Sequence, residues 1–426
     1  MSQNTQKNHS AEEVESFSKW GILIKRFTGL SKSFYLMLAF FLLIAVVGIG
    51  AGFHAMYIGY SHAYNITREI PWGILISTYV FFVVISTGLF IVSSLGYVFG
   101  LKDFMSIAKR AVFLSIVTVL AGFTVIFFEV ENPFRMAIYS LISPNLTSNL
   151  WWMGTLYGAY LFFIITAFIL LLTQKHKLAK YAGFFGVIAA VVANTNLGAE
   201  FGMLHAREFW YGAYLPIYFI PSAIMSGCAT ILFFTYLAHK VNNEPMDNAG
   251  TKALGVTTKL GILSICIVMF FTAWKIITGF VGTEGKIEAF KAMLIGKYAL
   301  NFWLFEISIG MAIPLILYIL FRGKNMEMIF VGSAFIILGI FFMRYDLVVL
   351  GQIVPVYYEL GVSEYETLLT YFPSAHEILI VLGGIGIVAT AFLLGEKVFN
   401  AHKVEVHENI ANSSDLIDLT KTETIK

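Results

Sequence analysis

Ionisable side chains are rare in this chain, and those that interrupt its apolar stretches fall near the same ends of the predicted helices. The 426 residues are 58% hydrophobic and 13% charged, whereas soluble domains carry about 25% charged residues. Charged groups inside membrane-spanning segments are costly and mark functional sites by default. The polar set comprises His54, Glu129, Glu200, His205, Arg207, Lys275, Glu306, Arg344, Asp346 and Glu377. Helical rise places all of them within roughly 10 Å of one membrane boundary, the outer one.

Acids and histidines gathered at one depth suit a ligand with an apolar tail and a head that exchanges protons, such as a quinone. Quinone reduction consumes two electrons and two protons, so each carbonyl needs a proton donor within hydrogen-bond reach. A single residue of the set is more simply explained by an interfacial or ion-pairing role, and only the gathering favours a site. The inner halves offer hydroxyls such as Ser264, Tyr318 and Thr390 but almost no charge. We therefore expect protons to exchange mainly with the outer side, with little or no coupled pumping.

The elements that position these residues are membrane-spanning helices. A mean hydropathy of +0.78 and apolar segments of about 20 residues predict an all-α polytopic membrane protein with ten spans. The predicted spans cover residues 34–60, 71–98, 111–129, 151–173, 181–199, 211–237, 256–281, 301–321, 327–347 and 374–395. The predicted organisation is a tail at 1–33 with an amphipathic surface helix, a transmembrane domain at 34–396, and a polar, disordered tail at 397–426.

The distribution of lysine and arginine predicts the orientation. Basic residues mark the N-terminal tail, the loops after the second, fourth, sixth and eighth spans, and the segment after the tenth. Ten spans place all of these on one side, which the positive-inside rule assigns to the cytoplasm together with both termini. The opposite loops, at 61–70, 130–150, 200–210, 282–300 and 348–373, are then outside. Lys286, Lys291 and Lys297 run against this trend.

Other classes of membrane protein remain open at this stage. A secondary transporter would favour charges and broken helices near the bilayer centre, where this chain has few. A b-type cytochrome needs two axial histidines, for which His54 and His205 are the plausible pair. The two cysteines show no cluster spacing, so no iron–sulfur cluster, metal site or disulfide framework is expected in the chain. The net charge of +2 gives no indication of nucleic acid binding.

Six groups of residues, in order along the chain, carry a resemblance to a known family. They read PWGILISTYVFFVVISTG (71–88), FEVENPFRM (128–136) with SNLWW (148–152), HAREFWYGAYLPIYFIPSAIMSGCA (205–229), FEISIGMAIP (305–314), RYDLVVLGQIVP (344–355) and YFPSAHE (371–377). Together they cover the chain from about residue 71 to residue 395. The chain resembles the NrfD/PsrC family of membrane subunits, which includes that of polysulfide reductase. It is most similar to the ten-helix branch of HybB, alternative complex III and QrcD.

The resemblance implies a fold, a substrate and partners. The fold is two four-helix bundles flanked by extra helices. Quinone from the menaquinone/ubiquinone pool is the redox partner in the membrane, with menaquinone the expected substrate, and no haem or iron–sulfur cluster is expected in the chain itself. A ferredoxin-like iron–sulfur subunit on the outer, periplasmic face would relay electrons to or from a catalytic or cytochrome subunit. The implied location is the bacterial cytoplasmic membrane, and the chain alone would not be a complete enzyme.

The resemblance also transfers to individual residues. Tyr79 matches a position at which the polysulfide reductase subunit has a quinone-site histidine. Glu129 keeps the acid of a D-L-G-R-P pattern that reads E-V-E-N-P here, so the arginine is lost unless Arg135 replaces it. Arg207 and Trp210 match an Arg/Trp pair. The predicted quinone-binding and proton-exchange residues are His54, Tyr79, Glu129, His205, Arg207, Glu306 and Asp346.

Overall fold

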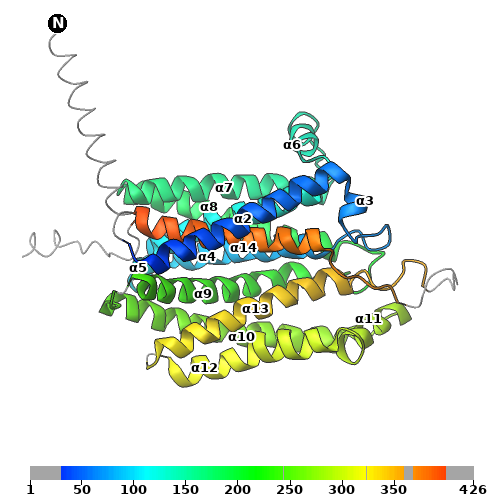
Figure 1. Ribbon diagram of the computed structural model, residues 1–426. Helices are drawn as coiled ribbons and strands as arrows, with labels where there is room; N and C mark the ends of the chain where they lie inside the picture. Colours follow the sequence, from blue (N-terminus) through cyan, green and yellow to red (C-terminus); the bar gives the residue numbers. More distant parts are fainter. Residues whose placement is uncertain (1–29, 243, 323, 359–367, 400–426) are drawn as a thin grey trace, which may run out of the picture.

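The protein is helical throughout the part that the structure describes. The computed structural model describes residues 30–242, 244–322, 324–358 and 368–399, and no strand occurs within these ranges. Ten helices in the same ranges are long and apolar enough to cross a membrane, which confirms the predicted all-α fold with ten spans. They run side by side in one bundle (Figure 1). The predicted surface helix before Leu30 and the predicted tail after Phe399 lie outside the described residues.

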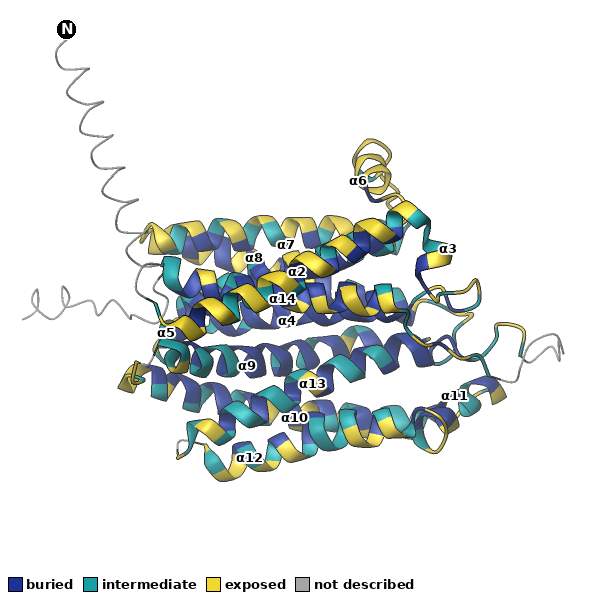
Figure 2. Ribbon diagram, in the orientation of Figure 1, coloured by how far each residue is buried: buried dark blue, intermediate teal, exposed yellow. Residues whose placement is uncertain are grey.

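One helix of the first four-helix bundle is buried on almost all sides. The bundle comprises α4 (Ile74–Tyr97), α5 (Met105–Glu129), α7 (Asn149–Leu172) and α8 (His176–Gly202). Helix α4 also packs against α9, α13 and α14, so nearly all of its side chains are buried, whereas α7 exposes a broad apolar face (Figure 2). Such exposed apolar surface is the expected contact with lipid.

The second bundle follows with the same number of spans. It comprises α9 (Tyr214–Asn242), α10 (Asn248–Gly279), the pair η2 (Asn301–Ala312) and α12 (Ile313–Phe321), and α13 (Met326–Leu350). Its α9 crosses α4 so closely that a Cβ at Gly88 would overlap the backbone of Ala223. Small residues at such crossings allow van der Waals packing in a medium that offers no hydrophobic drive. The four-by-four arrangement implied by the resemblance is thus present.

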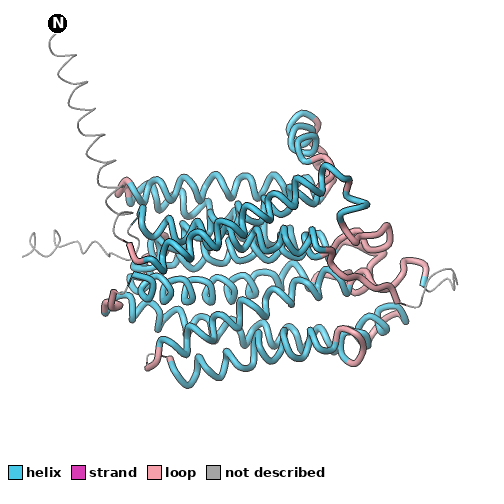
Figure 3. The backbone as a smooth tube through the Cα atoms, in the orientation of Figure 1, coloured by secondary structure: helices cyan, strands magenta, loops and turns pink. Residues whose placement is uncertain are grey.

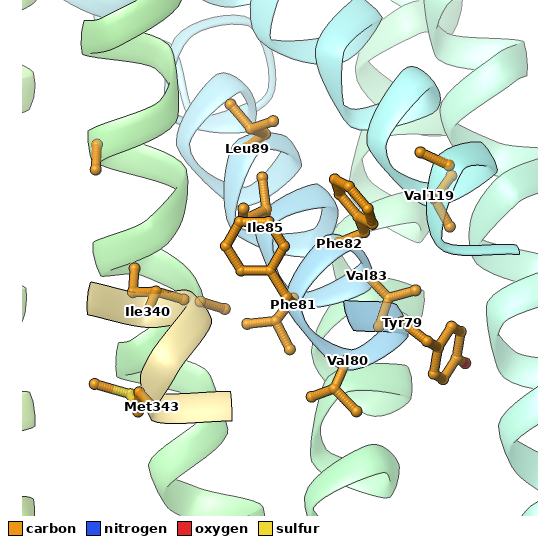
Figure 4. Packing of buried hydrophobic residues seen from close by; sticks show 14 of the residues in the cluster. Tyr79, Val80, Phe81, Phe82, Val83, Ile85, Leu89, Val119, Ile340 and Met343 are labelled. Atoms are coloured by element: carbon orange, nitrogen blue, oxygen red, sulfur yellow. The ribbon is translucent and has the colours of Figure 1, made fainter. Parts of the chain in front are cut away.

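Two helices flank the bundles. Helix α2 (Lys32–Ile58) packs along α14 (Ala375–Phe399), and α14 packs on α5. Ser31 caps α2 by accepting a hydrogen bond from the Phe34 amide at 3.3 Å, which explains where this span begins. The hydrophobic core is continuous between the two bundles, since Phe81 of α4 points toward Ile340 of α13 (Figure 4).

The longer loops gather at one end of the molecule. This end carries α3 (Tyr60–Ala63), α6 (Pro133–Ile142) and α11 (Glu284–Leu294), three short helices in segments that the sequence suggested only as loops (Figure 3). The first and last described residues lie at the other end, where the connections are short (Figure 1). The fifth predicted span, despite its asparagines, is α8, in which Asn194 accepts a hydrogen bond from Thr87 at 3.4 Å.

Candidate functional site

We call the half of the molecule next to the loop-rich end the outer half and the opposite half the inner half. The outer half of the second bundle holds three ionisable side chains that are almost completely buried. Glu306 of η2 is 1% exposed, and Arg344 and Asp346 of α13 are both 0% exposed. We call these three residues the buried charge cluster. Glu306 lies within electrostatic range of Arg344 and Lys275, and Asp346 lies within range of Glu306. Burying charges is expensive unless they are paired and hydrogen-bonded, so their partners decide what the cluster can do.

Most polar atoms of the buried charge cluster lack hydrogen-bond partners among the described residues. This holds for both carboxylate oxygens of Glu306, for Nε and Nη1 of Arg344, and for Oδ2 of Asp346. Arg344 donates from Nη2 to Ser222, its guanidinium lies 4.5 Å from the Phe219 ring, and Asp346 accepts from Asn301 at 3.3 Å. Buried groups are normally satisfied, so these atoms are open to hydrogen bonds from a ligand or water.

An unusual helix presents Glu306 to the cluster. Residues Asn301–Ala312 form a π-helix, a form that is rare and frequent at functional sites. Its i to i−5 backbone pattern extends to the amide of Ile313, which donates to the Ser308 carbonyl. The Ser308 hydroxyl also donates to the Trp303 carbonyl, at 2.7 Å. Below Glu306, a Cβ at Gly310 would lie 2.9 Å from Cα of Gly339, so η2 and α13 touch backbone to backbone. This contact fixes the depth at which Glu306 faces α13.

Tyrosine hydroxyls extend the polar region toward the first bundle. Tyr157 of α7 is completely buried, its hydroxyl has no partner among the described residues, and it lies within electrostatic range of Arg344. Its ring meets the ring of Tyr79 edge to face, with 6.4 Å between centroids. Tyr79 points away from Ile340 and Met343, and hence into the first bundle (Figure 4). The predicted Tyr79 and Glu306 are therefore linked through two residues, Tyr157 and Arg344.

A second buried acid, Glu377 of α14, is fully hydrogen-bonded at the outer rim. Its Oε1 accepts from the Tyr371 hydroxyl at 2.5 Å, and its Oε2 accepts from the backbone amides of Ser374 and Asn65 at 2.7 and 3.2 Å. Tyr371 in turn accepts from the Ile74 amide at 2.9 Å. Burial, and then the Glu377 carboxylate, raises the pKa of Tyr371. Glu377 thus ties the segment that leads into α14 to the connection between α3 and α4.

Glu129 is intermediate in hydrogen bonding between the buried charge cluster, which lacks most partners, and Glu377, which has them all. It ends α5, it is within electrostatic range of Glu377, and its Oε2 is buried without a partner among the described residues. Tyr64 donates to the carbonyl of Phe128 at 2.8 Å and Tyr60 to that of Val130 at 3.1 Å, so tyrosines cover the end of this helix. Glu129 remains available to a ligand or water on one oxygen.

Arg207 is placed differently from the other predicted site residues. Its guanidinium donates to the backbone carbonyls of Gln352, Val354 and Glu69 at 3.2, 3.1 and 2.7 Å. Burial lowers the pKa of this group, and three carbonyl partners offset that cost. Arg207 therefore joins three outer loops, and its described contacts do not include the buried charge cluster.

The predicted histidines do not face each other. Nδ1 of His54 lies 2.9 Å from Nε2 of His376, whereas His205 contacts the Met203 carbonyl at 3.0 Å and the ring of Tyr211. Two axial ligands must lie on opposite sides of a haem, and neither histidine has such a counterpart in these contacts. No group of three or more His, Cys, Asp or Glu that could hold a metal occurs among the described residues.

Comparison with known proteins assigns the chain to a family. Residues 62–356 match the family described as "Polysulphide reductase, NrfD". The chain belongs to the NrfD family. It is 27% identical to a selenate reductase subunit of Mesobacillus selenatarsenatis, over 89% of this chain and 97% of that protein. It is 25% identical to the "Hdr-like menaquinol oxidoreductase integral membrane subunit" of Archaeoglobus fulgidus, over 84% and 93%. The "Protein NrfD homolog" of Haemophilus influenzae is 23% identical over 67% and 96%.

One residue suggested as a substitute within the NrfD pattern lies elsewhere. Arg135 is on α6, where its guanidinium lies 5.3 Å from the centroid of the exposed Tyr139 ring. Helix α6 projects from the bundles beyond the end of α5 (Figure 1). We therefore do not assign Arg135 a role beside Glu129.

The expectation that the inner half is almost free of charge is wrong. Arg110 is 2% exposed and Glu396 is 4% exposed, and they form an ion pair with contacts of 2.6 and 3.1 Å. The sequence placed Arg110 in a loop and Glu396 after the last span. Because α5 begins at Met105 and α14 ends at Phe399, both residues lie inside helices. The start of α5 was hidden by the basic residues in its first turns, which delay the apolar stretch.

Proposed function

We propose that this NrfD-family chain is the quinone-interacting membrane subunit of a multi-subunit respiratory oxidoreductase. The names of two relatives support this, since one is a reductase subunit and the other a menaquinol oxidoreductase membrane subunit. The second name also favours menaquinone as the substrate over ubiquinone. The chain would exchange electrons with an iron–sulfur subunit docked on its outer face, and a catalytic or cytochrome subunit would complete the enzyme.

The observation that carries the proposal is the set of buried, unpartnered polar atoms in the outer half. Glu306, Arg344, Asp346, Tyr157 and Glu129 each have at least one such atom. A quinone head presents two carbonyl acceptors, which become two hydroxyl donors after uptake of two electrons and two protons. Arginine and tyrosine can donate to the carbonyls, and carboxyl groups can deliver or accept the protons.

We assign the headgroup to the region between Tyr79 and Tyr157 on one side and Arg344 and Glu306 on the other. Asp346 would adjust the charge of this region through Glu306. The isoprenoid tail, being apolar, would extend between helices toward lipid. These groups lie at the depth at which an outer-face electron donor or acceptor would be nearest.

The remaining predicted residues receive supporting roles in the proposal. Glu129 and His54 would exchange protons between the headgroup and the outer surface. His205 and Arg207 lie in the outer loop 203–213, where Arg207 holds the loops over the site. We also propose that the loop-rich end faces the periplasm and that both termini are in the cytoplasm of a bacterium, as the lysine and arginine distribution indicates.

Quinone titration of the purified complex tests this function. Electron transfer to a short-tailed menaquinone analogue should saturate with quinone concentration. Glu306→Gln and Tyr157→Phe remove a proton donor without changing side-chain shape, and each should lower quinone turnover by roughly 10²-fold, the lower end for general acid–base groups. Glu327→Gln is the matched control, since Glu327 is an exposed acid at the start of α13 that accepts from Tyr236 at 3.0 Å. Unchanged turnover in both site variants would place the quinone elsewhere.

A further inference from the structure

Two histidines from helices far apart in the sequence meet at the outer end of the flanking pair α2 and α14. Nδ1 of His54 and Nε2 of His376 are 2.9 Å apart. The ring planes differ by 3° and the centroids are 5.2 Å apart. A short nitrogen contact with parallel rings and well separated centroids means that the rings meet edge to edge. The in-plane orbitals of both nitrogens therefore point at the space between them.

The helices hold these two rings in place. A Cβ at Gly383 of α14 would lie 2.8 Å from Cα of Gly48 in α2, and a Cβ at Gly386 would lie 2.7 Å from the Ala45 amide. Backbones in such close contact cannot slide past each other without losing the packing. His54 lies about two turns beyond Gly48 on α2, and His376 lies in the first turn of α14. The pair is thus presented by two rigid elements, as a preorganised site requires.

We propose that His54 and His376 bind one divalent transition-metal ion of the Zn²⁺ class. Imidazole nitrogens ligate Zn²⁺ at about 2.0–2.1 Å in tetrahedral geometry. The two nitrogens must therefore separate by several tenths of an ångström, and each ring must turn so that its lone pair points at the ion. In the neutral pair one facing nitrogen carries a proton. Metal binding requires that ring to change tautomer, which moves the proton to its other nitrogen and leaves both facing nitrogens free to ligate.

The surroundings suit an open, exchangeable site more than a structural one. His54 is exposed, so water can fill the remaining coordination positions. The neighbouring Glu377 is engaged through both oxygens by Tyr371, Ser374 and Asn65. Structural zinc sites use four protein ligands, whereas sites with fewer protein ligands keep positions for water or another ligand. A bound ion would link α2 to α14 through His54 and His376, and by occupying Nδ1 of His54 it would block proton exchange at that nitrogen.

Calorimetric titration of the purified full-length protein with Zn²⁺ alone tests the site. At pH 7.5 we expect saturable binding of one ion, weakened at least about tenfold, or about 1.4 kcal/mol, in either His54→Ala or His376→Ala. Zn²⁺ should also raise the unfolding temperature of the wild-type protein but not that of either variant.

The controls are His205→Ala and His62→Ala, which remove exposed histidines at the same end of the molecule. Both should bind Zn²⁺ as the wild type does. If His54→Ala is poorly folded, His376→Gln keeps a hydrogen-bonding side chain and should still lose the ion. Absence of saturable binding to the wild type, or equal weakening in the control variants, would overturn the proposal. The outcome is independent of quinone turnover, so it does not depend on the proposed function.

Discussion

Two buried arginine–glutamate neighbourhoods occupy opposite halves of the molecule, and they differ in how far their polar atoms are satisfied. In the inner half, Arg110 holds Glu396 with two hydrogen bonds, at 2.6 and 3.1 Å. In the outer half, Arg344 and Glu306 are close enough to interact electrostatically. Yet Nε and Nη1 of Arg344 and both oxygens of Glu306 have no hydrogen-bond partner among the described residues.

We call the Arg110–Glu396 pair closed, because its charged groups bind each other, and the Arg344–Glu306 neighbourhood open, because most of its polar atoms have no partner among the described residues. A two-contact arginine–carboxylate pair satisfies the charges that it buries, so its role is completed by the fold. The open neighbourhood keeps buried donors and acceptors at a cost to stability. Proteins retain such costs where function needs them. We therefore propose a folding role for the inner pair and a ligand-binding role for the outer neighbourhood, and variants of each test this division.

The largest effect is expected from breaking the closed pair. Glu396→Ala leaves Arg110 as an unpaired buried charge, which costs about 3–5 kcal/mol. The variant should unfold at a much lower temperature in detergent and yield little monodisperse protein. Replacing both residues together, Arg110→Met with Glu396→Leu, removes the charge as well and should recover most of the stability. If the single variant is as stable as the wild type, the pair does not have the structural role that its geometry indicates.

The open neighbourhood should respond in the opposite way. Glu306→Gln gives up the attraction of the carboxyl group to Arg344 and Lys275, but it also removes the repulsion with Asp346 and the cost of burying an acid that forms no hydrogen bond with the described chain. These effects oppose each other, so we expect the free energy of unfolding to change by less than about 1 kcal/mol. Quinone turnover should fall roughly 10²-fold, equivalent to about 2.7 kcal/mol of activation free energy. Thermal unfolding and quinone titration on the same preparation measure both quantities. A strongly destabilised variant, or one with normal turnover, would remove the distinction between the two neighbourhoods.

Glu377 offers a smaller test within the outer half itself. It is buried at the same end as Glu306 but accepts three hydrogen bonds. Hydrogen bonds to charged groups are worth about 1.5–3 kcal/mol. Glu377→Gln keeps some of them, so a loss of about 1.5 kcal/mol in stability is expected, with quinone turnover within about twofold of wild type. A turnover defect as large as that of Glu306→Gln would show that a satisfied acid can also belong to the site.

The sequence predicts the fold and the depth of the site residues along their spans, but it does not predict which side chains contact one another. Helical periods and apolar lengths predict ten spans, and the position of each acid along its span gives its depth. Which atoms meet depends on contacts between distant segments: Glu377 binds Asn65, and Arg110 binds Glu396 across 286 positions. Tyr157 carries no local sign of its importance, since a tyrosine in an apolar helix is ordinary. The π-helical form of η2 has no signal in the residues that precede Glu306.

The difference also explains why Arg207 and Arg344 could not be ranked from sequence. Both lie near the outer boundary and both match family positions. Arg207 is satisfied by three backbone carbonyls from loops that only the folded chain brings together. Arg344 lies inside a span, where backbone carbonyls are already used by the helix, so its free donors remain. Arg110 also lies within a span, but Glu396 satisfies its donors, so an arginine within a span is a candidate for ligand binding only where no buried acid binds it.

The smallest effect is expected for proton movement across the whole bilayer. The inner half is not free of charge, because Arg110 and Glu396 lie there. The lack of charge predicted from the sequence therefore cannot be the reason for weak proton movement. The contacts of these two residues give a different reason for the same expectation: both carboxylate oxygens of Glu396 accept hydrogen bonds from Arg110, so Glu396 is engaged in a structural pair and is a poor relay. We therefore expect protons for quinone chemistry to exchange mainly with the outer side. In vesicles containing the whole complex and an internal pH dye, turnover should cause little uncoupler-sensitive change in internal pH. A large change that Glu306→Gln abolishes would mean that the open neighbourhood connects to the inner side after all.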